Sequence, residues 1–174
     1  MPEPVSFEIR PLAREDAPAW RALRLEALTN HPEAFGSSAE EFSQLSLDEA
    51  AERIPPAVGE DVLFGVFAGG ALCGCAGFAR EKYMKGRHKG LMWGVYLRPM
   101  LRGKGVGEAL VDRVIAHAAG HVEILNCAVN PENRGARSLY LSRGFKVYGR
   151  EPRALRTGGR DHDEELLALI LPGG

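Results

Sequence analysis

The sequence has 174 residues, 45% of them hydrophobic and 26% charged, with a formal net charge of −1 at pH 7. This length and composition are typical of one globular domain, and the net charge gives no sign of a basic surface that would bind nucleic acid or an anionic membrane. No apolar run approaches the roughly 20 residues that span a bilayer, and the N-terminal residues lack the basic start and apolar stretch of a secretory signal; we therefore expect a single cytoplasmic domain over residues 1–174.

The first third of the chain predicts one strand and two helices. Residues 5–11 alternate between apolar and polar side chains, as in a strand, and residues 14–30 have apolar side chains three or four apart, as in a helix. Ser46 and Glu49 have the spacing of a capping box, and the short helix that follows ends at Pro55–Pro56.

The middle of the chain predicts a hairpin, a further strand and a helix. Residues 62–68 and 71–78 read as strands joined by a tight turn at Gly69–Gly70. Another strand follows at residues 91–97, and apolar spacing predicts a helix from about Gly105 to Ala119.

The last third predicts a strand, a helix and two closing strands. Residues 122–129 form a nearly continuous apolar run, which predicts a strand buried on both faces. Asn133 can cap a helix that ends at Gly144, and residues 145–148 and 164–171 read as strands. The order predicts an α/β fold, with a mixed sheet covered by helices on both faces.

The three cysteines lie in apolar runs. Cys73, Cys75 and Cys127 lack the spacing of a zinc site, and their odd number does not make a disulfide framework. We expect small buried side chains and no metal site. A nucleophilic Cys127 is the alternative, and it needs a base beside it.

A glycine-rich loop joins the strand at 91–97 to the next helix. Gly103, Gly105 and Gly107 let the backbone turn tightly, and the first amides of a helix carry the positive end of its dipole. Arg102 and Lys104 add positive charge, so the loop suits a phosphate group. The alternative is a tight turn with solvated basic residues.

Two familiar phosphate motifs do not fit this loop. A dinucleotide fingerprint needs a third glycine where Glu108 stands. A P-loop needs Ser or Thr after Lys104, where the chain has Gly105, and a glycine where it has Arg98.

The loop instead resembles the coenzyme A loop of the GNAT superfamily of N-acetyltransferases, Gln/Arg-x-x-Gly-x-Gly/Ala, which Arg102, Gly105 and Gly107 match. Residues 133–145 resemble the family segment N-x-x-A-x-x-L-Y-x-x-x-G-F, and residues 24–42 and 148–171 are also similar to family members. The likeness therefore runs over nearly the whole chain.

The resemblance implies a single acetyltransferase domain with a mostly antiparallel mixed sheet and one βαβ unit at the coenzyme A site. Two strands next to the loop would splay apart around the pantetheine arm of acetyl-CoA, the implied cosubstrate. The implied cofactor-binding residues are Val95, Tyr96, Leu97, Arg102, Gly103, Lys104, Gly105, Val106, Gly107, Asn133, Arg137 and Tyr140. A helix cap is the alternative role for Asn133.

The implied reaction is direct transfer of the acetyl group to a primary amine, which we expect to belong to a small molecule. Backbone amides near residues 93–95 would stabilise the oxyanion, and Tyr140 would donate a proton to the leaving thiolate. A tyrosine packed in the core with a satisfied hydroxyl is the alternative for Tyr140.

The general base has no motif of its own. Glu26, Glu81, His88 and Glu123 qualify by residue type, but each is also a typical solvated group, and many family members use water relays. We therefore assign none of them.

The sequence does not determine the acceptor substrate or the oligomeric state. The resemblance implies that loops at about 31–45 and 149–163 frame the acceptor; arginines in the second loop alternate with acids, which favours a solvated loop. Alternatives to a small-molecule enzyme are a protein (lysine or N-terminal) acetyltransferase, transfer of a longer acyl group or to an oxygen acceptor, and a non-catalytic acetyl-CoA-binding module. A homodimer is expected from the family.

Overall fold

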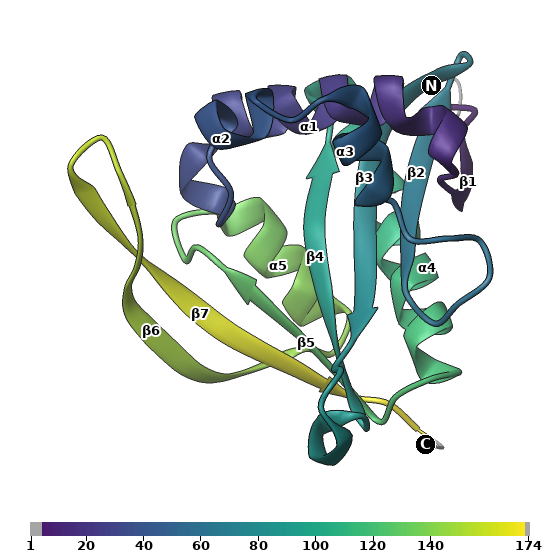
Figure 1. The fold of residues 1–174 in the computed structure, drawn as a ribbon. Helices are drawn as coiled ribbons and strands as arrows, with labels where there is room; N and C mark the ends of the chain where they lie inside the picture. The colour runs from purple at the N-terminus through teal and green to yellow at the C-terminus, as the bar shows by residue number, and fades with distance from the viewer. Residues whose placement is uncertain (1–4, 173–174) are drawn as a thin grey trace.

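A single sheet organises residues 5–172, the part of the chain that the computed structural model describes. Its strands are β1 (Glu8–Pro11), β2 (Val62–Ala68), β3 (Ala71–Arg80), β4 (Lys89–Leu97), β5 (Ile124–Val129), β6 (Lys146–Thr157) and β7 (Arg160–Ile170). They lie in the order β1-β2-β3-β4-β5-β7-β6 (Figure 1). Neighbours are antiparallel except β4 and β5, which are parallel, so the predicted mixed and mostly antiparallel sheet is confirmed.

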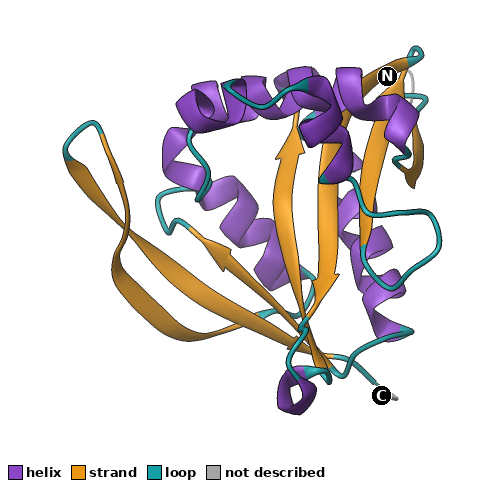
Figure 2. Cartoon of the chain, viewed as in Figure 1, coloured by secondary structure: helices purple, strands orange, loops and turns teal. Residues whose placement is uncertain are grey.

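Helices cover both faces of this sheet, as predicted (Figure 2). They are α1 (Ala17–Asn30), α2 (Ala39–Ser43), α3 (Leu47–Glu52), α4 (Val106–Ala119) and α5 (Arg134–Ser142). One apolar core joins α1, α2 and α3 to the sheet, and a second packs α4 and α5 against its other face. The connection β4-α4-β5 is the predicted βαβ unit.

Several local predictions are confirmed by the backbone. Ser46 and Glu49 form the capping box at the start of α3. Gly69 and Gly70 make the β2–β3 turn with φ of 58° and 79°, values that favour glycine. The three cysteines are free and buried, and the helices within residues 5–172 are too short or too polar to cross a membrane.

The prediction that β5 is buried on both faces is wrong. Leu125, Cys127 and Val129 are buried, whereas Ala128 between them is exposed and Asn126 is half-buried. The strand is therefore covered on one face only.

The predicted loops around the acceptor are also corrected. Residues 31–45 contain a short 3-10 helix (Pro32–Ala34) and α2. Residues 149–163 are not a loop, because β6 and β7 continue as a long hairpin that turns at Gly158–Gly159, with φ of 55° and 75°. Figure 1 shows the tip of this hairpin standing away from the rest of the chain.

Candidate functional site

The parallel strands β4 and β5 pair at one end of the sheet and separate toward the other. Their ladder joins Lys89, Gly90 and Leu91 to residues 124–126 and then stops. The remaining backbone of β4, from Met92 to Leu97, therefore has no strand on that side. Because buried backbone polar groups need partners, this free edge suits a ligand that runs along it.

A bulge in β4 shapes the same region. Cys75 of β3 pairs with Tyr96 and Gly77 pairs with Trp93, so Gly94 and Val95 together face a single β3 residue. Gly94 has a φ of 64°, a left-handed value that an L side chain rarely adopts.

A cavity of about 490 Å³ lies where the two strands separate, which is within the usual range for small-ligand sites. It is bounded by β4, by the end of β5, by the start of α4, by α5 and by residues 31–35 that follow α1. The predicted cofactor residues that line it are Val95, Tyr96, Leu97, Arg102, Gly103, Gly107, Asn133 and Tyr140.

The other predicted cofactor residues do not line the cavity. Val106 is fully buried in the core, whereas Lys104 and Gly105 are exposed in the loop. The Arg137 guanidinium donates to Glu165 at 2.6 Å, and this carboxylate raises the pKa of Arg137. Arg137 is therefore engaged with β7 and away from the cavity.

The glycine loop leads directly into α4. Gly103 and Gly105 have φ of 69° and 79°, and Gly105 is the N-cap of the helix. The Ala109 amide donates to the Gly105 carbonyl at 3.1 Å, so the helical ladder starts there and the earlier amides have no partner within the helix. The helix end can therefore bind an anion.

Arg102 and Asn133 support the cavity as well as lining it. The Arg102 guanidinium donates to the Leu97 carbonyl at 2.8 Å, which holds the end of β4 against the loop. The Asn133 side chain accepts from the Ala136 amide at 3.2 Å, so its capping role is present alongside its place at the cavity.

Tyr140 reaches the cavity from the buried face of α5. It is 5% exposed, and its hydroxyl makes no hydrogen bond to another residue within 5–172. The ring packs in the core, as the alternative for Tyr140 expects, but its hydroxyl has no partner among the described residues. Burial raises the pKa of Tyr140, which keeps the hydroxyl protonated and able to donate.

Cys127 lines the same cavity but is a poor nucleophile. Burial raises the pKa of its thiol to about 12, so the thiolate is scarce at neutral pH.

Of the base candidates, only Glu26 contacts a residue of the cavity. Its carboxylate accepts from the Tyr96 hydroxyl at 2.9 Å and pairs with Arg98 at 2.9 Å. Burial raises the pKa of Glu26, but the hydrogen bonds from Arg98 and Tyr96 outweigh it and leave the pKa lowered. Glu26 is thus a stable anion in an ion pair.

The remaining candidates lie at the opposite end of the sheet, where β4 begins. The Glu81 amide donates to the Lys89 carbonyl at 3.0 Å, and the Glu123 amide donates to the His88 carbonyl at 2.8 Å. None of the three lines the cavity.

Sequence reasoning missed several polar groups at the cavity. His31 and Glu33 line it, with Nδ1 and Oε1 3.8 Å apart. Asn130 lines it too, and its buried side-chain nitrogen has no hydrogen-bond partner among the described residues. Arg24 lies behind the wall formed by Phe35 and Gly94. These groups come from two distant segments, which no local spacing could connect.

The arginines of the β6–β7 hairpin are paired with acids. Arg150 contacts Asp163 at 2.9 Å, Arg156 contacts Asp161 at 2.5 Å, and Arg160 contacts Glu132 at 2.8 Å. None of these arginines lines the cavity; two of the pairs lie within the hairpin, and the third joins the hairpin to Glu132, which does line the cavity.

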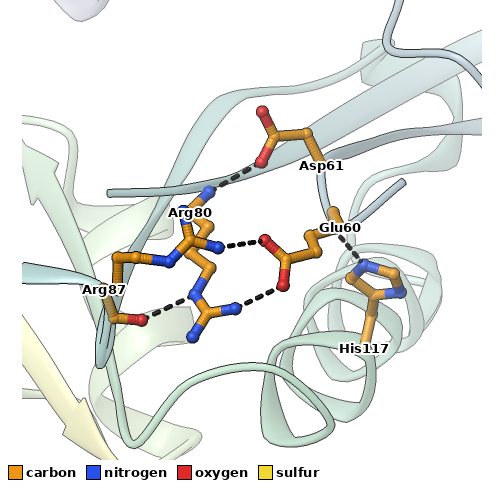
Figure 3. Close-up of polar contacts among 5 residues, drawn as sticks. All are labelled: Glu60, Asp61, Arg80, Arg87 and His117. Atoms are coloured by element: carbon orange, nitrogen blue, oxygen red, sulfur yellow. Dashed lines mark hydrogen bonds and ion pairs between the residues drawn. The ribbon is translucent and has the colours of Figure 1, made fainter. Parts of the chain in front are cut away.

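A second polar cluster lies at the end of the sheet where β4 and β5 pair (Figure 3). Glu60 bridges Arg80 and Arg87, and the Arg80 amide donates to Asp61 at 2.8 Å. His117 of α4 donates from Nε2 to the Glu60 carbonyl at 2.7 Å. Because every group here has a partner, the cluster holds the segment before β2 against β3 and α4.

Comparison with known proteins places this geometry in a family. The model of the acetyltransferase (GNAT) family matches residues 20–145. A comparison with curated proteins gave no match.

Solved structures of similar fold include several acetyltransferases. The putative acetyltransferase yncA from Salmonella typhimurium, with its cofactor acetyl-CoA, has a TM-score of 0.81 at 20% identity, over 97% of this chain and 95% of that one. A phosphinothricin acetyltransferase from Sinorhizobium meliloti in complex with AcCoA has a TM-score of 0.81 at 19% identity, over 95% and 88%. A GCN5-related N-acetyltransferase from Kribbella flavida has a TM-score of 0.81 at 22% identity, over 98% and 100%. At these identities the likeness shows the fold.

Proposed function

Since the chain belongs to the GNAT family of acetyltransferases, we propose that it transfers the acetyl group of acetyl-CoA directly to the primary amine of a small molecule. Membership makes it an acyl-CoA-dependent N-acyltransferase. The observation that carries the proposal is the cavity between β4 and β5, which the glycine loop and Tyr140 both line. The loop proposed to bind the pyrophosphate and the tyrosine proposed to donate a proton thus line one cavity.

The residues present fit acetyl-CoA. Backbone groups of Val95 and Leu97, on the free edge of β4, would pair with the pantetheine arm. Amides of residues 102–107 at the start of α4 would hold the pyrophosphate. Asn133 lies at the cavity from α5 and would contact the same substrate.

The chemistry then follows from the groups around the bulge. An ammonium has no lone pair, so the acceptor must lose a proton before its nitrogen attacks the thioester carbonyl. We propose that a chain of water molecules along His31 and Glu33 accepts this proton, because the Glu26 carboxylate is already paired with Arg98.

Attack places negative charge on the carbonyl oxygen, which backbone amides near residues 93–95 stabilise. The carbon–sulfur bond then breaks with its electron pair leaving on sulfur, and the nitrogen, which became positively charged on attack, loses its second proton to water. Tyr140 donates its hydroxyl proton to that thiolate and regains one from solvent. The products are the N-acetylated amine and free coenzyme A.

Ligand-dependent thermal unfolding tests the proposal. A ligand at a hundred times its dissociation constant adds about 2.7 kcal/mol of stability, which raises the unfolding temperature of a domain of this size by about 5–10 °C. We expect that shift with acetyl-CoA and none with NAD or ATP, followed by thiol release when primary amines are added. A shift only with NAD or ATP would show that the loop serves another ligand.

We also propose a cytoplasmic homodimer with one domain over residues 1–174. The three free, buried cysteines support a reducing compartment. The dimer is an expectation from the family, and sedimentation at working concentration measures it.

A further inference from the structure

Arg24 is a buried cation without a counter-ion. It lies on α1 one turn after Trp20 and one turn before Leu28, which are both buried, and it is itself 9% exposed. Its guanidinium makes no hydrogen bond or ion pair within residues 5–172, and Nη1 is sealed from solvent. Buried guanidinium groups are normally paired, because an unpaired buried charge is strongly unfavourable.

The surroundings of Arg24 offer no acid to compensate the charge. The Glu26 carboxylate, on the same helix, is held by Arg98 and Tyr96. Burial lowers the pKa of Arg24, the neighbouring Cys75 thiol opposes this effect in part, and the positive charge of Arg53 lowers the pKa further. The acids among the cavity-lining residues are Glu33, Glu108 and Glu132; Glu33 faces His31, and Glu132 pairs with Arg160.

The guanidinium does lie against the cavity wall. It stacks on the Phe35 ring, with Cζ 4.8 Å from the ring centroid. A Cβ atom at Gly94 would stand 3.5 Å from Arg24 Nη1, so the bulge lies directly against the guanidinium and separates it from the cavity. Phe35 and Gly94 both line the cavity.

We propose that Arg24 binds a compact oxyanion carried by the acceptor, so that the substrate class is an amine with a carboxylate or similar group close to its nitrogen. This inference rests on the proposed function, in which the acetyl carbonyl lies beside residues 93–95. Because Gly94 belongs to that segment, an anion on Arg24 stands near the attacking amine. A short separation between the anion and the attacking nitrogen suits an amino acid better than an amine whose anionic group lies at the far end of a long chain. A planar guanidinium also matches a carboxylate with two parallel hydrogen bonds.

The test compares matched acceptors and two variants. The acceptors are amino acids, their decarboxylated amines and the matching aminophosphonates, and the variants are Arg24→Met and Arg24→Lys. Thiol release gives kcat/KM for each acceptor, calorimetry gives acetyl-CoA affinity, and thermal unfolding is measured with and without each acceptor. The phosphonate arm separates recognition of a carboxylate from recognition of any oxyanion.

We expect wild-type protein to favour at least one amino acid over its decarboxylated amine by about 100-fold, and Arg24→Met to lose that preference. Arg24→Lys should retain part of this preference, because lysine keeps the positive charge but lacks the planar guanidinium that donates two parallel hydrogen bonds. The favoured amino acid should raise the unfolding temperature of wild type and leave that of Arg24→Met unchanged. Without ligand, Arg24→Met should unfold about 2–4 °C higher, since it removes an unpaired buried charge.

Other outcomes overturn the inference. Equal losses with both members of each acceptor pair would mean that Arg24 acts on the acetyl oxygen. A lower unfolding temperature for Arg24→Met would make the guanidinium a structural group. No amino acid favoured over its decarboxylated amine would exclude an anionic acceptor. Failure of wild-type protein to bind acetyl-CoA would instead overturn the proposed function, and with it the basis of this inference.

Discussion

The two ends of the central sheet handle polar groups in opposite ways. At the paired end, where β4 and β5 share a ladder, Glu60, Asp61, Arg80, Arg87 and His117 satisfy one another (Figure 3). At the open end, where the strands separate, Arg24 Nη1 and the Asn130 side-chain nitrogen are buried without partners, and the Tyr140 hydroxyl bonds to no described residue. Helix α4 spans both ends of the same sheet.

We interpret the polar groups of the paired end as stabilising the fold and those of the open end as available to bind a ligand. A buried polar atom without a hydrogen bond reduces stability by roughly 1–3 kcal/mol. Such atoms persist where a bound molecule compensates them, and functional sites are the usual place. The open end should therefore respond to substitution mainly in binding and rate, and the paired end mainly in stability.

The largest expected effect comes from Tyr140→Phe, which tests the open end. Removing the proton donor should lower kcat by about 100-fold or more. Stability and acetyl-CoA affinity should hardly change, because the hydroxyl has no hydrogen bond among the described residues and the ring stays in place. Steady-state thiol release, calorimetry and thermal unfolding measure the three quantities.

The pH dependence gives a control for the same group. The raised pKa of Tyr140 keeps it protonated beyond its usual value of about 10, so its ionisation should cause no fall in the wild-type rate below about pH 10. An unchanged rate in Tyr140→Phe would instead favour another proton donor, or a protein that binds acetyl-CoA without catalysis.

A smaller effect is expected from Gly105→Val. Gly105 has a φ of 79° and no atom near the place of a side chain, so a valine would fill the space beside the first amides of α4. We expect acetyl-CoA to bind about tenfold more weakly or worse, through crowding of the pyrophosphate. The backbone strain should also reduce stability by about 1–2 kcal/mol.

Gly70→Val is the matched control for that strain. Gly70 has the same φ of 79° and an equally open surrounding, but it lies in the β2–β3 turn outside the cavity. Both variants should lose similar stability in urea unfolding, and only Gly105→Val should lose affinity in calorimetry. Equal affinity in the two variants would show that the loop does not hold the pyrophosphate.

The sequence predicted the elements whose side chains are buried and missed those that stand in solvent. The Gly69–Gly70 turn was predictable because apolar strands flank it. The same dipeptide at Gly158–Gly159 was not, because charged residues such as Arg156 and Asp161 surround it and pair with each other. Hydrophobic alternation reports burial on one face, so a hairpin with little buried surface gives no such signal.

At the site, spacing predicted what is local and failed for what the fold assembles. The glycine loop and Tyr140 belong to continuous motifs, and Gly103, Gly107 and Tyr140 do meet at one cavity. Arg24 was passed over, although a charged residue four positions after Trp20 falls on the buried stripe of its helix. A charge on an apolar stripe was the one available signal, and only the structure shows that it has no partner.

The smallest effect is expected at the paired end, from Glu60→Gln. This change removes the charge that bridges Arg80 and Arg87 but keeps the backbone carbonyl to which His117 donates. The Glu60 side chain is 40% exposed, so we expect a loss of only about 0.5–1 kcal/mol in urea unfolding, and a smaller loss in 1 M salt, which screens the pair. Acetyl-CoA affinity and kcat should stay at wild-type values, since nothing in the cluster lines the cavity. A change in affinity would mean that α4 couples its two ends, because His117 and the glycine loop belong to or adjoin the same helix, and the division between a stabilising end and a binding end would then fail.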